Sequence, residues 1–77
     1  MMHPTTRALL EFFAWEHLPP HLAAVSKKFD ALAHDLAEIP GPETTAGLRK
    51  LLEAKDCAVR AAHAAHAAAT TEAPRQD

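Results

Sequence analysis

The stretch at residues 22–39, LAAVSKKFDALAHDLAEI, carries the clearest helical pattern in the chain. Its large apolar residues follow one another at intervals of three, four, three, four and three: Leu22, Val25, Phe29, Leu32, Leu36 and Ile39. This spacing is typical of a heptad seam, the face along which one helix packs lengthwise against another at a shallow angle. It predicts a helix over residues 19–38. The run Pro40-Gly41-Pro42 then predicts a sharp stop.

A second long helix is predicted over residues 43–69, directly after that stop. Acidic Glu43 lies in its first turn, where negative charge complements the helix dipole. The apolar face of this helix consists of Leu48, Leu51, Leu52, Ala58, Val59 and Ala62. Because a short connection between two long amphipathic helices makes them antiparallel neighbours, the two are expected to form a helical hairpin.

A shorter helix is predicted near the start of the chain, over residues 6–17, with Thr5 or Thr6 as its N-cap. Its apolar face consists of Leu9, Phe12 and Phe13. No stretch of alternating polarity predicts a strand. The predicted fold class is therefore all-α, a short N-terminal helix followed by an antiparallel two-helix hairpin.

The chain is small for a protein that folds as a monomer. A domain of 77 residues buries only ~60% of the surface that its unfolded chain exposes. Cys57 is the only cysteine, so no disulfide can form within the chain. We therefore expect one helical-hairpin domain over residues 6–69, between a loose N-terminus (1–5) and a disordered tail (70–77), that gains stability as a homo-oligomer.

The charge balance and the hydropathy of the chain argue against two classes of partner. Eight Lys and Arg against ten Asp and Glu give a net charge of −2, so duplex DNA or RNA is not expected as a partner. No apolar run approaches the ~20 residues that span a membrane, and the pattern of a signal peptide is absent. The predicted location is the cytoplasm, whose reducing conditions suit a lone thiol.

Residues that could carry out catalysis are scarce. Ser26 is the only serine, and no nucleophile-elbow pattern surrounds it. The only glycines, Gly41 and Gly47, are too few and too far apart for a loop that cradles phosphate. An enzyme is therefore the least supported class, and no cofactor is expected.

Six histidines raise the question of a metal site. His17 and His21 are four residues apart, and His63 and His66 are three apart. Zinc needs three or four converging ligands, and the spacing offers no third ligand. We predict no specific metal site, although a metal-sensing hairpin stays an alternative. The roles of the histidines and of Cys57 stay open.

Lys55 is out of place on the predicted helix 43–69, because it falls near the centre of the apolar face. Two interpretations stay open. The ammonium group pairs with an acid, for which Glu16 is the candidate, or it points into a pocket that holds an anion. Lys28 flanks the heptad seam, where it would meet a neighbouring chain, whereas Lys27 points away from the seam. Trp15 either covers the hairpin or stacks on a flat ring.

Two segments of the sequence resemble a known family. They are FAWEHLPP (13–20), with an aromatic residue and a histidine before a proline corner, and PETTAGLRKLLEA (42–54), which leads into an alanine-rich helix. The chain resembles, over about residues 12–62, the helical-hairpin domain of phage anti-CBASS and anti-Thoeris proteins. These are small oligomeric sponges that sequester cyclic nucleotide signals. Cys57 and Val59 depart from the pattern, because the family often has Trp and Asn there.

The resemblance implies a non-enzymatic sponge for cyclic oligonucleotide immune signals, such as cyclic dinucleotides, that counteracts anti-phage signalling in the bacterial host cytoplasm. It also implies a symmetric homo-oligomer, with a hexamer as one candidate size. By position, Trp15 and His17 match the aromatic-histidine segment, and Lys50 matches a lysine of the family motif. The expected ligand-binding residues are Trp15, His17, Lys28, Lys50 and Lys55. The alternative is a helical protein–protein interaction module without a nucleotide ligand.

Overall fold

The computed structural model describes residues 2–71, and every element in that range is helical. The elements are α1 (Pro4–Leu10), a short 3₁₀ helix η1 (Glu11–Phe13), α2 (Pro20–Ala37) and α3 (Pro42–Thr71). No strand occurs between residues 2 and 71, so the predicted all-α class is confirmed. Of the predicted tail, Thr70 and Thr71 belong to α3, and residues 72–77 lie outside the described residues.

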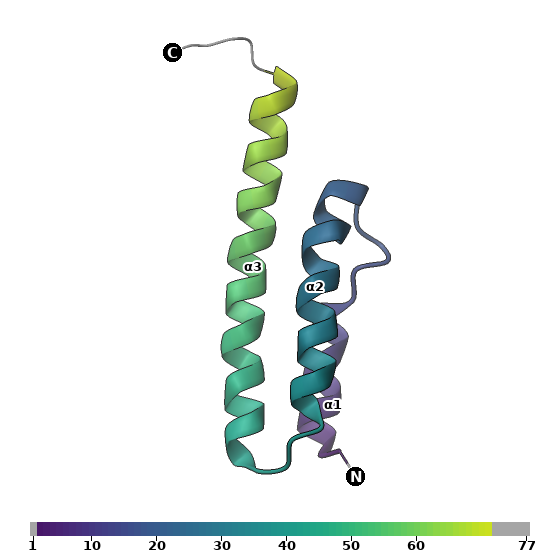
Figure 1. The fold of residues 1–77 in the computed structure, drawn as a ribbon, viewed down its shortest axis with the longest axis vertical. Coiled ribbons are helices and arrows are strands. Elements are labelled where there is room, and N and C mark those ends of the chain that lie inside the picture. The colour runs from purple at the N-terminus through teal and green to yellow at the C-terminus, as the bar shows by residue number, and fades with distance from the viewer. Residues whose placement is uncertain (1, 72–77) are drawn as a thin grey trace.

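The two long helices, α2 and α3, lie side by side and run in opposite directions (Figure 1). α1 packs against both of them, toward the end at which α2 turns into α3. α3 has 30 residues against 18 in α2, and it extends beyond the start of α2 (Figure 1). In spite of these lengths, none of the helices between residues 2 and 71 is apolar enough to cross a membrane.

Prolines set the limits of α2 and α3. Pro20 and Pro42 each occupy the first position of a helix. Proline suits this position because an N–H there would make no hydrogen bond within the helix, and because its fixed φ is helical. Gly41 in the turn between them has a φ of 117°, which L side chains rarely adopt. The Thr44 hydroxyl closes this turn by donating to the Ile39 carbonyl at 2.6 Å. Both helices begin and end within two residues of their predicted limits.

The first predicted helix is wrong in both of its limits. It begins at Pro4 rather than residue 6, and its N-cap is His3, whose Nδ1 accepts from the Thr5 N–H at 3.0 Å. The helix gives way to η1, after which Ala14 has an extended ψ of 142°. This early end turns the chain back toward the start of α2. Trp15 and His17 consequently lie in the connection before α2 and not on a helix.

The core lies where all three helices meet. Its buried apolar residues are Phe13, Ala33, Ala37 and Leu48. Along α2 the most buried positions are Ser26, Ala33 and Ala37, which are offset from the predicted seam because α1 and η1 cover this helix as well as α3. Two members of that seam are therefore exposed, Leu32 by 46% and Ile39 by 55%.

Candidate functional site

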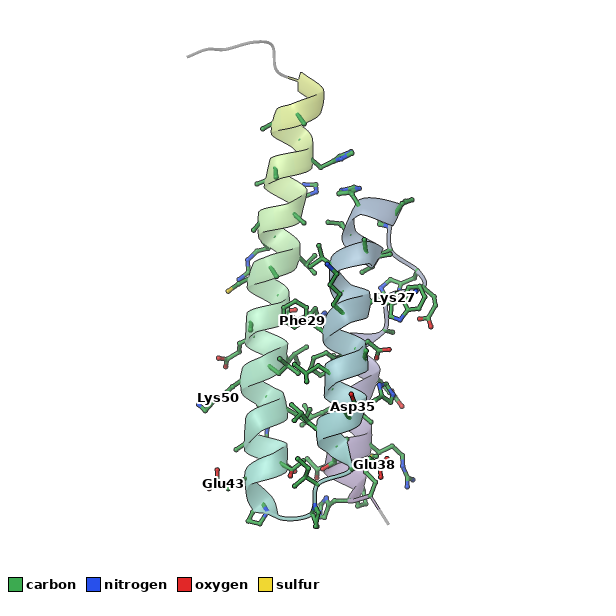
Figure 2. The ribbon with its side chains drawn as sticks, viewed as in Figure 1. Lys27, Phe29, Asp35, Glu38, Glu43 and Lys50 are labelled. Atoms are coloured by element: carbon green, nitrogen blue, oxygen red, sulfur yellow. The ribbon has the colours of Figure 1, made fainter. Side chains whose placement is uncertain are left out.

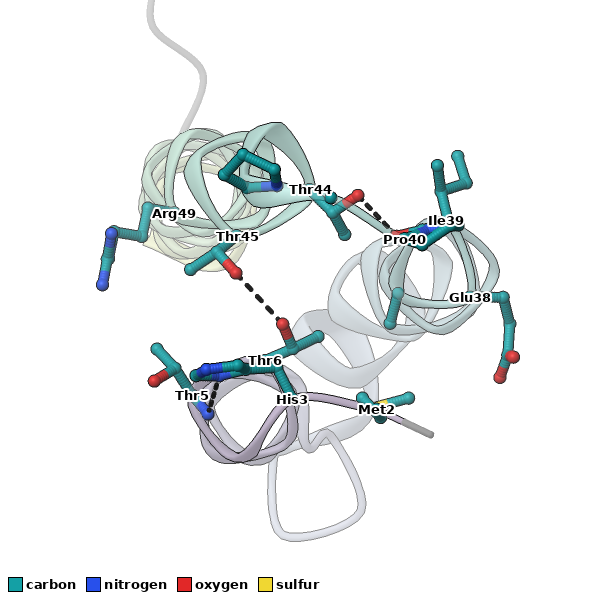
Figure 3. A pocket seen from close by; sticks show the side chains of 13 residues that line it. Met2, His3, Thr5, Thr6, Glu38, Ile39, Pro40, Thr44, Thr45 and Arg49 are labelled. Atoms are coloured by element: carbon teal, nitrogen blue, oxygen red, sulfur yellow. Dashed lines mark hydrogen bonds between the residues drawn. The ribbon is translucent and has the colours of Figure 1, made fainter.

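A pocket of about 870 Å³ opens between the start of α1 and the turn that joins α2 to α3 (Figure 3). Its volume falls within the range of small-molecule sites. Threonine hydroxyls from two helices line it, supplied by Thr5 and Thr6 of α1 and by Thr44 and Thr45 of α3. Both threonine pairs lie in the first turn of a helix that begins with proline, and the chain topology brings those two turns together.

Three hydrogen bonds fix the walls of this pocket. The hydroxyl oxygens of Thr6 and Thr45 are 3.1 Å apart and join α1 to α3, and Thr6 is buried. The Thr44 hydroxyl donates to the Ile39 carbonyl in the turn, and the His3 ring accepts from the Thr5 N–H at the cap of α1. The hydroxyl of Thr5, by contrast, lies on an exposed side chain. The walls are therefore set before any ligand arrives.

Two charged residues line the pocket with opposite signs. Arg49 comes from α3 and Glu38 from the end of α2, and they stand at opposite edges of the pocket (Figure 3). Both side chains are exposed. The start of α3, where the helix dipole is positive, also lines this pocket. Neither Arg49 nor Glu38 is among the ligand-binding residues predicted from the sequence.

Lys55 occupies the position on α3 that the helical spacing predicts. Its side chain is only 13% exposed, and its Nζ lies 3.3 Å from the Oδ1 of Asp56. The predicted partner was wrong, because Glu16 lies in the connection before α2, where its Oε1 accepts from the Trp15 N–H at 3.3 Å. The cation is thus held by the neighbouring residue on its own helix.

The other predicted ligand-binding residues lie on the surface of different elements. Lys50 is exposed on the outer side of α3 and points away from α2 (Figure 2). Trp15 is half-buried, and the Lys27 Nζ lies over its ring at 5.1 Å from the centroid, a cation–π contact. Lys27 and Lys50 are on opposite sides of the molecule (Figure 2). Lys28 and His17 are exposed.

The predicted ligand-binding residues Trp15, His17, Lys28, Lys50 and Lys55 do not line the pocket. Because Lys50 and the Trp15–Lys27 pair face opposite sides, one chain does not bring them together around a single ligand. A ligand that touches several of them must lie between chains. This prediction consequently depends on self-association.

Two histidines that the sequence analysis treated separately come together in the fold. The rings of His21 on α2 and His66 on α3 are stacked, with centroids 3.7 Å apart and planes inclined by 13°. Burial lowers the pKa of His21 below its ordinary value, and the nearby His66 and His63 lower this pKa further. The residues that the structure describes contain no group of three or more His, Cys, Asp or Glu side chains arranged to hold a metal ion.

Cys57 is exposed on α3, where its Sγ accepts a hydrogen bond of 3.3 Å from the Arg60 guanidinium.

Comparison of the chain with protein-family models, with curated proteins and with solved structures found no significant match. The resemblance to the anti-CBASS and anti-Thoeris proteins therefore stays a prediction.

Proposed function

We propose that this chain is a non-enzymatic binding protein that sequesters a cyclic nucleotide, such as a cyclic dinucleotide, and works as a homo-oligomer. The observation that carries the proposal is the separation of charge across the pocket. The guanidinium of Arg49 points outward from one edge of the pocket (Figure 3), and by turning inward it can hold a phosphate through two parallel N–H donors. Glu38 at the opposite edge can accept hydrogen bonds from the amino group of a base. A nucleotide carries both groups.

The chemistry of the lining supports retention of the ligand without reaction. Catalysis by a hydroxyl needs a base within hydrogen-bond reach to activate it. The only histidine of the lining, His3, uses its Nδ1 to cap α1, and the hydroxyls of Thr6 and Thr44 are bonded to other groups. The pocket thus offers donors and charge to a ligand but no activated nucleophile.

The surface of the chain supports self-association. Phe12 is 62% exposed, and Leu32 and Ile39 are exposed as well, while the buried apolar core of the described residues contains four side chains. Covering such side chains with a second copy of the α2–α3 hairpin would add apolar burial that the single chain lacks. A neighbouring copy would also bring the exposed Lys28 toward a ligand bound at its partner. In the bacterial host cytoplasm, sequestration of this kind would counteract anti-phage signalling.

Calorimetric titration of the full chain with a panel of cyclic dinucleotides and trinucleotides tests the ligand. The key variant is Arg49→Gln, and Lys50→Gln is its matched control, since Lys50 is the next residue of α3 but lies outside the pocket. Loss of a charged hydrogen bond of about 1.5–3 kcal/mol weakens binding ~10–100-fold. We expect this loss in Arg49→Gln and unchanged affinity in Lys50→Gln.

Three results would count against the proposal or change it. No heat with any member of the panel, together with an unchanged melting temperature, rejects a cyclic nucleotide ligand. A loss confined to Lys50→Gln or Lys55→Gln moves the ligand from the pocket to the residues predicted from sequence. Glu38 is not part of the site if nucleotides whose bases have or lack an amino group bind with equal affinity and Glu38→Gln does not change that affinity.

A second candidate function is a helical protein–protein interaction module without a nucleotide ligand. The exposed Leu32 and Ile39 favour it, because they continue one apolar edge of α2 into the turn. Sedimentation velocity on the wild type and on Leu32→Gln separates the two uses of this edge. A fall in mass for the variant assigns the edge to self-association. A monomeric wild type leaves the edge free for another protein.

A further inference from the structure

The stacked rings of His21 and His66 have no part in the proposed binding of a ligand. His21 is in the first turn of α2, and its ring contacts the distal half of α3. The stack therefore joins the beginning of one helix to the part of α3 that lies farthest from the pocket (Figure 1). Loss of this contact would free the start of α2 and leave the three-helix core intact.

The geometry of the stack suits neutral rings and opposes charged ones. Two imidazolium rings with centroids 3.7 Å apart would place like charges in direct contact. In addition, the Nε2 of His21 is shielded from water and has no hydrogen-bond partner. An imidazolium carries an N–H on both nitrogens, so protonation would leave a shielded donor without an acceptor.

Among the described residues, the titratable groups that act on the pKa of His21 are two other histidines. On α3, His63 lies one turn before His66, and both act on His21. Along α2, the nearest residues with a permanent charge are Lys27 and Lys28, which are also cations. No carboxylate among the described residues acts on the pKa of His21. A proton at this stack therefore finds no stabilising partner.

We propose that the His21–His66 stack is a proton-sensitive contact that holds the first turn of α2 on α3 while His21 is neutral and releases it when His21 is protonated. It is a device built into the fold, and it is independent of the ligand. Its function is to make the geometry around the start of α2 depend on pH.

The direction of the effect follows from linkage. The pKa of His21 in the docked state is lowered from 6.5, so the released state binds more protons below that value. The contribution of neutral His21 to docking is therefore fully present above about pH 6.5 and is lost as the pH falls below that value. If release takes up one proton, the ratio of docked to released forms falls by up to ~10-fold for each pH unit within the titration range.

Nuclear magnetic resonance on the full chain tests the proposal. The Leu22 and Ala23 amides both bond to the Pro19 carbonyl in the first turn of α2, so hydrogen exchange in residues 22–25 reports on docking there. We expect a nuclear Overhauser effect between the two rings at pH 8 that disappears at pH 5. We also expect exchange of these amides, corrected for its intrinsic pH dependence, to be ~10-fold faster at pH 5.

Two variants and a control separate charge from shape. His66→Phe keeps an aromatic ring but removes one like charge, so the midpoint of His21 rises, while the part of the pH dependence that comes from the burial of His21 remains. His66→Gln removes the stack, so exchange is fast at both pH values. His17→Gln, in the exposed connection, should behave as the wild type. The proposal is overturned if the rings stay in contact at pH 5, or if His66→Gln keeps the slow exchange of the wild type at pH 8.

Discussion

Phe12 and Phe13 are adjacent and chemically identical, yet the fold gives them opposite environments. Phe13 is fully buried in the core beside Ala33 and Leu48, whereas Phe12 is 62% exposed. Replacement of Phe13 by Ala removes a buried ring and leaves a cavity, which costs about 3–5 kcal/mol. The same replacement at Phe12 removes a ring that is already largely in water, so we expect a change within about 0.5 kcal/mol.

The loss at Phe13 is large against the whole stability of such a chain. At ~0.05–0.15 kcal/mol per residue, 77 residues correspond to a free energy of unfolding of roughly 4–12 kcal/mol. Urea unfolding followed by far-UV circular dichroism measures both variants. With a slope of ~1–3 kcal/mol per molar urea, Phe13→Ala lowers the midpoint by at least ~1 M or abolishes the transition. Phe12→Ala leaves the midpoint nearly unchanged.

The measurement is made at low micromolar protein, where self-association contributes least, and is repeated at ten times that concentration. If Phe12→Ala lowers the free energy of unfolding only at the higher concentration, the Phe12 ring lies in an interface between copies. Equal losses for the two variants at low concentration would refute the reasoning, because they would put both rings in the core, as one continuous helix over residues 6–17 requires.

Two further predictions use the same unfolding assay. Thr6→Val removes the hydrogen bond between α1 and α3 and leaves the Thr45 hydroxyl without that partner, so it should lower the free energy of unfolding by ~1–2 kcal/mol. The control Thr5→Val should be close to neutral, and equal effects of the two variants would show that the bond adds no stability. Gly41→Ala should destabilise by ~1–2 kcal/mol because φ is 117° there, while Gly47→Ala, inside α3 with open space around its Cβ, should stabilise by ~0.5–1 kcal/mol. Two changes of the same sign would contradict the assigned backbone.

The parts of the fold that could be predicted from sequence are those set by local rules. Prolines mark the start of α2 and of α3, and Gly41 marks the turn between them. The position of Lys55 on α3 follows from helical periodicity alone, and the structure leaves its side chain mostly buried. Each of these features depends on residues within one or two turns of one another.

The parts that could not be predicted depend on how separate segments meet. The early end of the first helix turns Phe13 into the core, which no local preference in residues 6–17 requires. The stack of His21 on His66 depends on the register between two helices, and a heptad pattern does not fix that register. The sequence does contain a feature of the pocket, because paired threonines follow a proline at the start of both α1 and α3. Only the topology shows that these two helix starts are neighbours.

Retention of an unchanged cyclic nucleotide is the property that most directly tests the proposed function. Equilibrium dialysis of the full chain against a cyclic dinucleotide, followed by mass spectrometry of the ligand recovered after denaturation, tests retention and chemistry together. We predict that the wild type concentrates the ligand on its side of the membrane, that Arg49→Gln does so ~10-fold less well, and that the recovered mass equals that of the starting compound. Equal ligand on both sides, or recovery of a hydrolysed product, would contradict the account.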